Sequence, residues 1–215
     1  MSTLSKLVLG VMGQLRPRPA KGDAATTIAL PAPGRAGGMP LMEAFALRRS
    51  SREFAPDALP LPLLSNLLWV AWGVNREGGG RTAPSALDAQ EIDVYVALPA
   101  GAYRYDAAGH ALELVAAADL RRITGYQDFV DEAPLDLVYV AEHRRMSMVP
   151  VAQRVSFASA AAGAIAQNVY LFAAASGLAT VIRAWIDRDA IAAGLGLAHD
   201  QQVLLSQTVG YPPRA

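Results

Sequence analysis

Three arginines and two serines stand together at residues 48–52, in the run Arg-Arg-Ser-Ser-Arg, which we call the arginine turn. Guanidinium groups bind phosphate and carboxylate oxygens in bidentate pairs, and a serine hydroxyl adds a further donor. Because Pro56 follows closely and a proline stops a helix from simply continuing, these side chains can converge on one anion. Arginines at the end of a helix are also well placed as solvated groups that favour the helix dipole. The run alone leaves both interpretations open.

A second candidate is the segment of small and polar residues from Gly80 to Gln90, which leads directly into an expected strand. Small residues let a flat aromatic ligand approach the backbone, and Asp88 and Gln90 can hydrogen-bond the edge of a ring. The same residue types also form ordinary turns. A loop without a ligand is therefore the alternative interpretation.

The remaining residue types disfavour several other enzyme chemistries. The chain of 215 residues has no cysteine, which excludes a thiolate nucleophile and a cysteine-type metal site. Its three histidines are not at metal-ligand spacing from carboxylates, so no metal is expected. Its serines lack the glycine-flanked elbow of a hydrolase nucleophile. No Walker-type loop and no convincing dinucleotide fingerprint is present.

Charge and hydropathy limit the expected partners. The 19 lysines and arginines balance 19 aspartates and glutamates, and 53% of the residues are hydrophobic. A neutral chain lacks the basic excess that binds a nucleic-acid backbone. No uninterrupted apolar run approaches the roughly 18 residues of a membrane span. We expect a domain with one large core and, given the low charge, a subunit interface.

Residues 1–38 are expected to form an extended N-terminal arm, because prolines and glycines punctuate residues 16–38 without helical or strand periodicity. Residues 39–215 are expected to form the folded domain. Lys6 and the apolar residues 7–12 resemble the start of a secretory signal, but a convincing cleavage site does not follow. A cytoplasmic location is therefore favoured over export to the periplasm.

Apolar periodicity predicts the elements that position the candidate segments. Strands and helices alternate without a regular βαβ rhythm, which favours an α+β fold. Helices are predicted over 40–47, 62–74, 151–177 and 187–195. Strands are predicted over 91–98, 102–105, 111–115, 135–141, 179–185 and 202–209.

Together with the segment from Gln167 to Thr180, the two candidate segments resemble the nitroreductase family of FMN-dependent oxidoreductases. The closer resemblance is to the branch grouped with thiazole/oxazole-forming dehydrogenases. The similarity covers about residues 39–213 and rests on several motifs in order. It implies a central mixed, largely antiparallel sheet flanked by helices, and an interlocked homodimer that holds FMN at its interface.

The resemblance also implies roles for individual residues. In the family, the arginine turn grips the FMN phosphate and ribityl chain, and the Pro-Ser segment approaches the flavin from the other subunit. The strand after the long helix passes its backbone along the reactive edge of the ring. A basic residue after the final Gly-Tyr-Pro often completes the phosphate site. The cofactor-binding residues implied here are Arg48, Arg49, Ser50, Arg52, Pro84, Ser85, Ala86, Asp88, Gln90, Ile182, Arg183, Ala184 and Arg214.

Two of these residues depart from the family pattern. Many relatives have asparagine where Asp88 stands, and an ionised carboxylate accepts hydrogen bonds but donates none. Arg183 stands where many relatives have a glutamate or a small residue. A cation beside the ring would favour anionic reduced flavin and raise its potential. In the alternative, the Arg183 side chain turns away and pairs with Asp187.

A bound flavin would perform the redox chemistry, so no catalytic side chain is required. The resemblance implies an enzyme that uses NAD(P)H as a diffusible donor and reduces nitroaromatic, quinone or similar small-molecule acceptors by ping-pong hydride transfer. Acceptor selectivity is expected from Tyr126, Phe129 and the loop 142–150. Two alternatives remain: an FMN-dependent dehydrogenase of azoline rings in a modified peptide, and a non-catalytic flavin-binding module.

Overall fold

The computed structural model describes residues 1–214, which form five α-helices, nine strands and four short 3₁₀ turns. The α-helices are α1 (Thr3–Val11), α2 (Leu41–Leu47), α3 (Leu61–Trp72), α4 (Val151–Ala175) and α5 (Arg188–Leu195). The 3₁₀ turns are η1 (Ala86–Asp88), η2 (Arg121–Thr124), η3 (Asp128–Asp131) and η4 (His143–Met146). The strands are β1 (Arg18–Pro19), β2 (Thr27–Ala29), β3 (Ile92–Leu98), β4 (Gly101–Asp106), β5 (Ala111–Ala116), β6 (Ala118–Asp119), β7 (Leu135–Glu142), β8 (Ala179–Arg183) and β9 (Gln201–Gly210).

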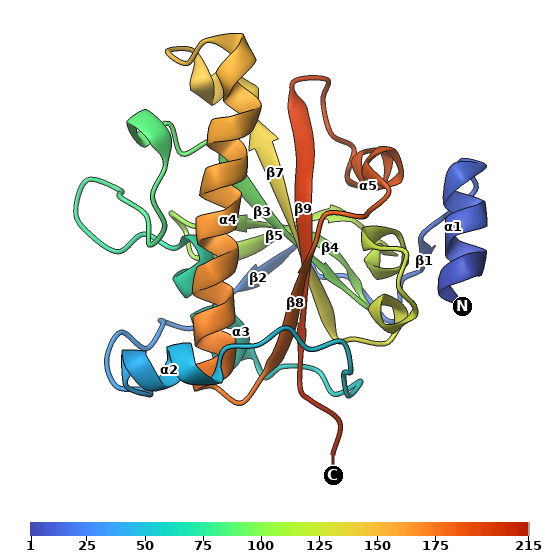
Figure 1. Cartoon of the computed structure of the whole chain (residues 1–215), viewed down its shortest axis with the longest axis horizontal. Helices are drawn as coiled ribbons and strands as arrows, with labels where there is room; N and C mark the ends of the chain where they lie inside the picture. The colour runs from blue at the N-terminus through green and yellow to red at the C-terminus, as the bar shows by residue number, and fades with distance from the viewer. Residues whose placement is uncertain (215) are drawn as a thin grey trace.

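A seven-stranded sheet in the order β2-β5-β4-β3-β7-β9-β8 lies between helices on both faces (Figure 1). The predicted α+β fold with a sheet flanked by helices is confirmed. Every pair of neighbouring strands in the sheet is antiparallel. The sheet within residues 1–214 therefore has no parallel pair, whereas the resemblance implied a mixed, largely antiparallel sheet.

The helices and strands predicted after residue 39 are confirmed, and their ends agree with the structure within two residues. The arm differs from the prediction, because residues 1–38 contain α1, β1 and β2. β2 joins the edge of the main sheet through β5, and β1 pairs with β6 in a separate two-stranded sheet. Strands of two or three residues are too short to show periodicity, and they form here because partner strands are in place.

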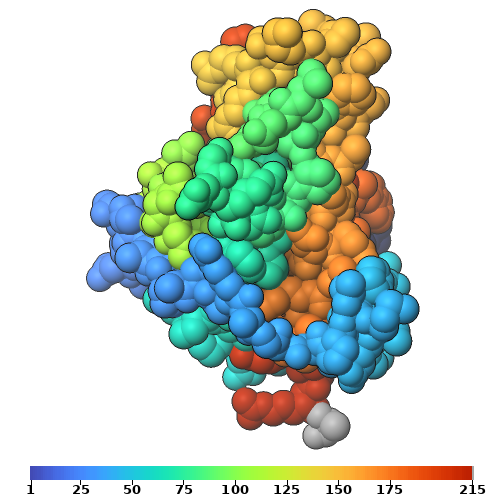
Figure 2. Space-filling model, turned by 90° about the vertical axis from the view of Figure 1, so that its left-hand side faces the viewer, coloured from blue at the N-terminus to red at the C-terminus, as the bar shows by residue number. Residues whose placement is uncertain are grey.

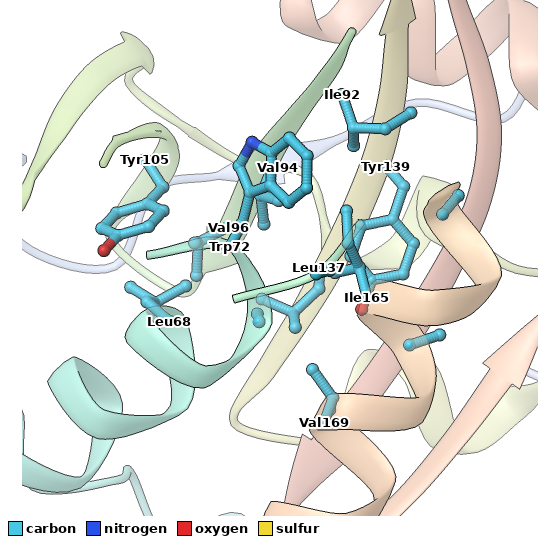
Figure 3. Packing of buried hydrophobic residues seen from close by; sticks show 14 of the residues in the cluster. Leu68, Trp72, Ile92, Val94, Val96, Tyr105, Leu137, Tyr139, Ile165 and Val169 are labelled. Atoms are coloured by element: carbon cyan, nitrogen blue, oxygen red, sulfur yellow. The ribbon is translucent and has the colours of Figure 1, made fainter. Parts of the chain in front are cut away.

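The main core lies between the sheet and the pair α3 and α4 (Figure 3). Leu137 and Tyr139 of β7 project from the sheet toward Ile165 and Val169 of α4, and all four are fully buried. A second, smaller core covers the other face of the sheet, where α5 and η2 pack. Consecutive strand residues therefore point into different cores, as the two-residue period of a strand requires.

α4 is the one helix within residues 1–214 whose length and hydropathy match a membrane span. Core helices of folded domains can meet the same criterion, and α4 packs its buried side against the sheet, α2 and α3. Small buried residues, including Ala158, Ala162 and Ala166, bring its backbone close to its neighbours. We therefore describe α4 as the core helix that supports the sheet.

His110 connects the turn between β4 and β5 to α3. Its Nδ1 lies 2.8 Å from the hydroxyl of Tyr105, and its Nε2 lies 2.7 Å from the hydroxyl of Ser65. The Ser65 hydroxyl in turn donates to the carbonyl of Pro31 at 2.6 Å. Burial lowers the pKa of His110 below its ordinary value, because desolvation disfavours the charged ring.

We expect the free energy of unfolding to fall as the pH drops below about 6.5. The folded state resists protonation of His110, whereas the unfolded chain accepts the proton, so this contribution is complete above the unfolded pKa and is lost as the pH falls below it. Denaturant titrations of the wild type and His110→Gln between about pH 5 and pH 8 measure the effect. A wild-type advantage that does not depend on pH would contradict this expectation.

Candidate functional site

The arginine turn follows α2 directly and is hydrogen-bonded to α4 and β8. Ser50 Oγ lies 2.8 Å from the hydroxyl of Tyr170 in α4. The backbone N–H of Ile182 in β8 donates to the same hydroxyl at 3.0 Å. One residue after Ser50, the N–H of Ser51 donates to the carbonyl of Thr180 at 3.0 Å. The turn is therefore fixed against the C-terminal part of α4 and along β8.

A cavity of about 340 Å³ opens beside the arginine turn, where α2, α4 and β8 meet. Arg49 lines the cavity and makes no hydrogen bond or ion pair within residues 1–214. The guanidinium of Arg48 lies over the ring of Tyr170, with Cζ 5.4 Å from the ring centroid. A free guanidinium beside mostly small and apolar walls suits an anionic group attached to an organic body. The other lining residues are Leu47, Ser51, Ala173, Ala174, Gly177, Leu178, Ala179, Thr180 and Pro212.

Arg52 and Arg214 lie in two neighbouring hollows rather than in this cavity. Arg214 lines a hollow of about 460 Å³ that shares Gly177 and Pro212 with the cavity. It forms an exposed ion pair with Asp57 at 3.4 Å. Arg52 lines a hollow of about 340 Å³ on the next stretch of surface. The arginine turn and the C-terminal tail thus form a cationic surface around the cavity.

The segment 84–90 lies near the opposite end of α4 from the arginine turn (Figure 1). Both segments face the same side of the molecule, with α4 between them (Figure 2). Ser85 is turned inward, where its Oγ accepts a hydrogen bond from the N–H of Gln90 at 2.8 Å. Pro84 is exposed and Ala86 is half-buried. One copy of the chain therefore does not bring this segment to the arginine turn.

Three non-glycine residues of this segment adopt the left-handed backbone conformation. The φ angles are +55° at Leu87, +51° at Asp88 and +49° at Gln90. Left-handed backbone at a residue with a Cβ costs of the order of 1–2 kcal/mol. Such strain concentrates at functional sites, and here it coincides with the segment predicted to approach a ring.

Asp88 and Gln90 also line a polar cavity of about 340 Å³ beside the β4–β5 hairpin. The side-chain oxygen of Gln90 accepts a hydrogen bond from Arg81 Nε at 2.8 Å. The Arg81 guanidinium lies 5.6 Å from the ring centroid of Trp72, which is buried in the core. Gln90 is thus already engaged within the chain. Asp88 is exposed, and within residues 1–214 its carboxylate accepts one hydrogen bond, from the Gln90 amide at 3.2 Å.

Arg183 turns away from the cavity and into the other face of the sheet. Its Nη2 lies 2.7 Å from Asp136 Oδ1, and both side chains are buried. The suggested pair with Asp187 is wrong, because that carboxylate caps α5 by accepting from the N–H of Ala190 at 3.0 Å. Ile182 packs on the core formed with α4, so its neighbour Arg183 must point to the opposite side.

Burial shifts both partners of this ion pair toward their neutral forms. It lowers the pKa of Arg183 and raises the pKa of Asp136, and the attraction between the two groups opposes both shifts. The hydroxyl of Thr208 donates to the same Asp136 oxygen that Arg183 contacts. Only the backbone of Arg183 therefore remains at the side of β8 that faces the arginine turn, and Ala184 is exposed just beyond the strand.

The aromatic residues expected to select an acceptor do not line the cavity. Tyr126 packs against Trp185 on the second core, with ring centroids 5.5 Å apart. Phe129 packs against Phe54, also at 5.5 Å, and lies beside Arg183.

Tyr170 is a site residue that the sequence prediction missed. It lies 120 positions from Ser50 and 12 positions from Ile182, and it contacts both. Tyr170 lies within the segment from Gln167 to Thr180 that carried the family resemblance, and this position was the sequence feature that could have identified it as a site residue.

Comparisons with known proteins agree with this architecture. The model of the nitroreductase family matches residues 46–211. A solved structure from Ralstonia eutropha JMP134, provisionally named a nitroreductase, is 55% identical, with a TM-score of 0.90 and coverage of 94% of this chain and 96% of that chain. A Methanocaldococcus jannaschii protein with a provisional nitroreductase name is 32% identical over 144 residues, which are 62% of this chain and 73% of the relative.

A chain in the Escherichia coli microcin synthetase complex McbBCD shares the fold more distantly. It is 19% identical, with a TM-score of 0.68 and coverage of 99% of this chain and 93% of that chain. Similarity at this identity shows the fold alone. The family match and the two more similar relatives carry the assignment, and the chain belongs to the nitroreductase family of flavin-dependent oxidoreductases.

Proposed function

We propose that the protein binds FMN and uses NAD(P)H to reduce nitroaromatic, quinone or similar acceptors. The observation that carries the proposal is Arg49, a guanidinium that lines the cavity and has no hydrogen-bond or ion-pair partner within residues 1–214. The neighbouring Arg48 and Ser50 add donors, and small residues of α4 leave room for the organic part of a ligand. The donor set fits a phosphate ester, since arginine forks match phosphate oxygens.

The chain's own residues supply binding and orientation. The arginine turn binds the phosphate and ribityl chain, while Arg52 and Arg214 add positive charge around it. The backbone of residues 182–184, at the end of β8 and just beyond it, would line the ring, and the hydroxyl of Tyr170 fixes that strand to the turn. Bound flavin supplies the hydride-transfer chemistry, which explains why no side-chain nucleophile is needed.

The site is completed in a homodimer. α2 exposes Leu41, Met42 and Phe45, with 61%, 78% and 48% of their surface accessible. The end of α4 near the segment 84–90 exposes Val151, at 75%. α2 and the beginning of α4 lie on the same face of the molecule as the segment 84–90 (Figure 2). A second copy placed on this face would bring its segment 84–90, including Pro84, Ser85, Ala86, Asp88 and Gln90, to the arginine turn.

Phe45→Glu is expected to weaken the dimer by at least about tenfold, because it places a charge in an apolar contact. Light scattering after size-exclusion chromatography, across a range of concentrations, measures the change. Leu4→Glu is the matched control, since Leu4 is equally apolar and exposed but lies on α1 at the other side of the sheet. If Phe45→Glu leaves the dimer intact while Leu4→Glu dissociates it, the interface lies on the α1 side.

The function is tested by loading the purified protein with FMN, removing the excess and recording the visible spectrum. Absence of bound flavin contradicts the proposal. Anaerobic mixing with NADH and with NADPH then separates the candidates. Bleaching followed by steady turnover with an acceptor supports the proposed reductase. FMN that stays oxidised in both mixtures indicates a non-catalytic flavin-binding module, or a dehydrogenase of azoline rings that takes its electrons from a modified peptide.

A further inference from the structure

The N-terminal helix α1 buries one residue completely, and that residue is charged, while the apolar Leu9 packs half-buried against the second core. Lys6 is the only buried residue of α1, and its side chain is fully inaccessible. Leu4, Val8 and Val11 point outward, with 73%, 51% and 85% of their surface exposed. The docking of this helix therefore depends on what Lys6 contacts as well as on Leu9, and Leu15 anchors the arm further along.

Lys6 contacts the short turn η3 and the residue before it. Its Nζ lies 2.6 Å from Asp131 Oδ1 and donates to the carbonyl of Gln127 at 2.7 Å. A second cation of the arm, Arg18, pairs with the other oxygen of Asp131 at 2.7 Å. The N-terminal amine and Arg122 also lie 3.6 Å from this carboxylate, and Lys6 is the fully buried cation among its partners. The arm therefore fixes both ends of η3.

η3 in turn carries Phe129, which touches both segments that form the candidate cavity. Its ring centroid lies 5.5 Å from that of Phe54, two residues after the arginine turn. On the other side, Cζ of Arg183 lies 5.7 Å from the Phe129 centroid. Arg183 ends β8 and follows Ile182, whose N–H is bonded to Tyr170. A continuous series of contacts thus joins Lys6 to the arginine turn and to β8 from behind.

We propose that Lys6 is a positioning residue for the cavity: by docking α1 on Asp131 it holds η3 and Phe129 in place, and these hold the arginine turn and β8. The choice of FMN as the ligand rests on the proposed function, whereas the coupling between arm and cavity is a property of the chain itself. Linkage between two binding events is reciprocal. FMN that orders the turn therefore favours the docked arm, and loss of docking weakens FMN binding by the same factor.

The chain offers a direct probe of docking, because Lys6 and Lys21 are its only lysines. Lys21 is exposed, whereas Lys6 is buried. Limited acetylation of the wild type, read by mass spectrometry, gives a separate rate for each amine. We expect Lys6 to react more slowly than Lys21, and saturating FMN to slow Lys6 by a further factor of about five or more without changing Lys21. An unchanged Lys6 rate in protein that has bound FMN would overturn the proposal.

Lys6→Met tests the coupling without any ligand, and Lys21→Met is the matched control. Hydrogen exchange should become severalfold faster at the Ile182 amide and over residues 48–54 in Lys6→Met alone. Exchange changes confined to the arm and to η2 and η3 would overturn the proposal. If FMN binds, Lys6→Met should raise its dissociation constant about tenfold.

The two hypotheses fail in different ways. Protein that binds no FMN contradicts the proposed function, while the exchange experiment still decides the role of Lys6. Should Lys6→Met destabilise the whole fold, amides of β7 would exchange faster as well. The acetylation rates of the wild type then decide, since they require no variant. If the protein binds no FMN, the acetylation rate of Lys6 is measured with and without inorganic phosphate instead. A Lys6 rate that phosphate leaves unchanged overturns the proposed coupling between the arm and the cavity.

Discussion

Arg49→Ala is expected to raise the dissociation constant for FMN by about 10- to 100-fold, the loss of one or two charge-assisted hydrogen bonds. The side chain makes no hydrogen bond or ion pair within residues 1–214, so its removal should leave the free energy of unfolding nearly unchanged. Flavin fluorescence titration measures binding, and denaturant titration measures stability. The combination of lost binding with retained stability is the signature of a ligand-binding arginine.

Arg188→Ala serves as the control for the loss of one positive charge. Arg188 is exposed at the start of α5, on the opposite side of the sheet from the cavity. Its removal should leave FMN affinity within about twofold of the wild type, since exposed charges farther apart than about 10 Å are largely screened by salt. Equal affinities for wild type and Arg49→Ala would remove the arginine turn from the binding site.

Asp136→Leu is expected to lower the free energy of unfolding by about 3–5 kcal/mol. Asp136 is fully buried, and it is the only carboxylate within residues 1–214 that pairs with Arg183. The substitution leaves a guanidinium inside the protein with no counter-ion, and burial already lowers the pKa of that group. Denaturant titration at neutral pH gives the loss directly.

The double variant Asp136→Leu with Arg183→Met separates the cost of an unpaired charge from the cost of altered packing. Replacing both charges by apolar groups of similar size is often close to neutral, so most of the lost stability should return. The coupling between the two sites follows from the double-mutant cycle. A double variant as unstable as Asp136→Leu would show that shape, rather than charge, dominates at this position.

Local sequence pattern was sufficient for most of the fold. α4 is recognisable because Ile165, Val169 and Phe172 recur at helical spacing; Ile165 and Val169 are fully buried and Phe172 is partly buried. The antiparallel hairpin of β4 and β5 follows from alternating residues on both sides of a turn. These signals lie within one element or between sequence neighbours, where the chain itself fixes the geometry.

Contacts between elements that are distant in the sequence could not be predicted from local sequence pattern. The nearby Asp187 was the natural partner to suggest for Arg183, but β7 supplies Asp136 across the sheet, 47 positions earlier in the chain. Tyr170 escaped notice for the same reason, since only the fold brings it to Ser50. The role of each segment in the cavity thus depends on strand order, which periodicity does not specify.

The N-terminal arm escaped prediction for a different physical reason. Amphipathic patterns indicate which face of a helix is buried because the apolar side usually turns inward. In α1 the fully buried residue is Lys6, whereas the apolar Val11 is exposed and Leu9 is only half-buried against the second core. The buried ion pair contributes to this orientation, and its partner Asp131 lies 125 positions away.

Because of the left-handed backbone at Leu87, Asp88 and Gln90, we expect some substitutions in this segment to raise stability while they lower activity. Glycine at the exposed positions Leu87 or Asp88 would relieve roughly 1 kcal/mol of strain without disturbing the core. Directed evolution for heat resistance would therefore collect glycines there early. Under selection for turnover we expect the same substitutions to be rejected, because they free the segment that, in the proposed dimer, would meet the partner's cofactor. Stability-guided engineering of this enzyme should leave these three positions unchanged.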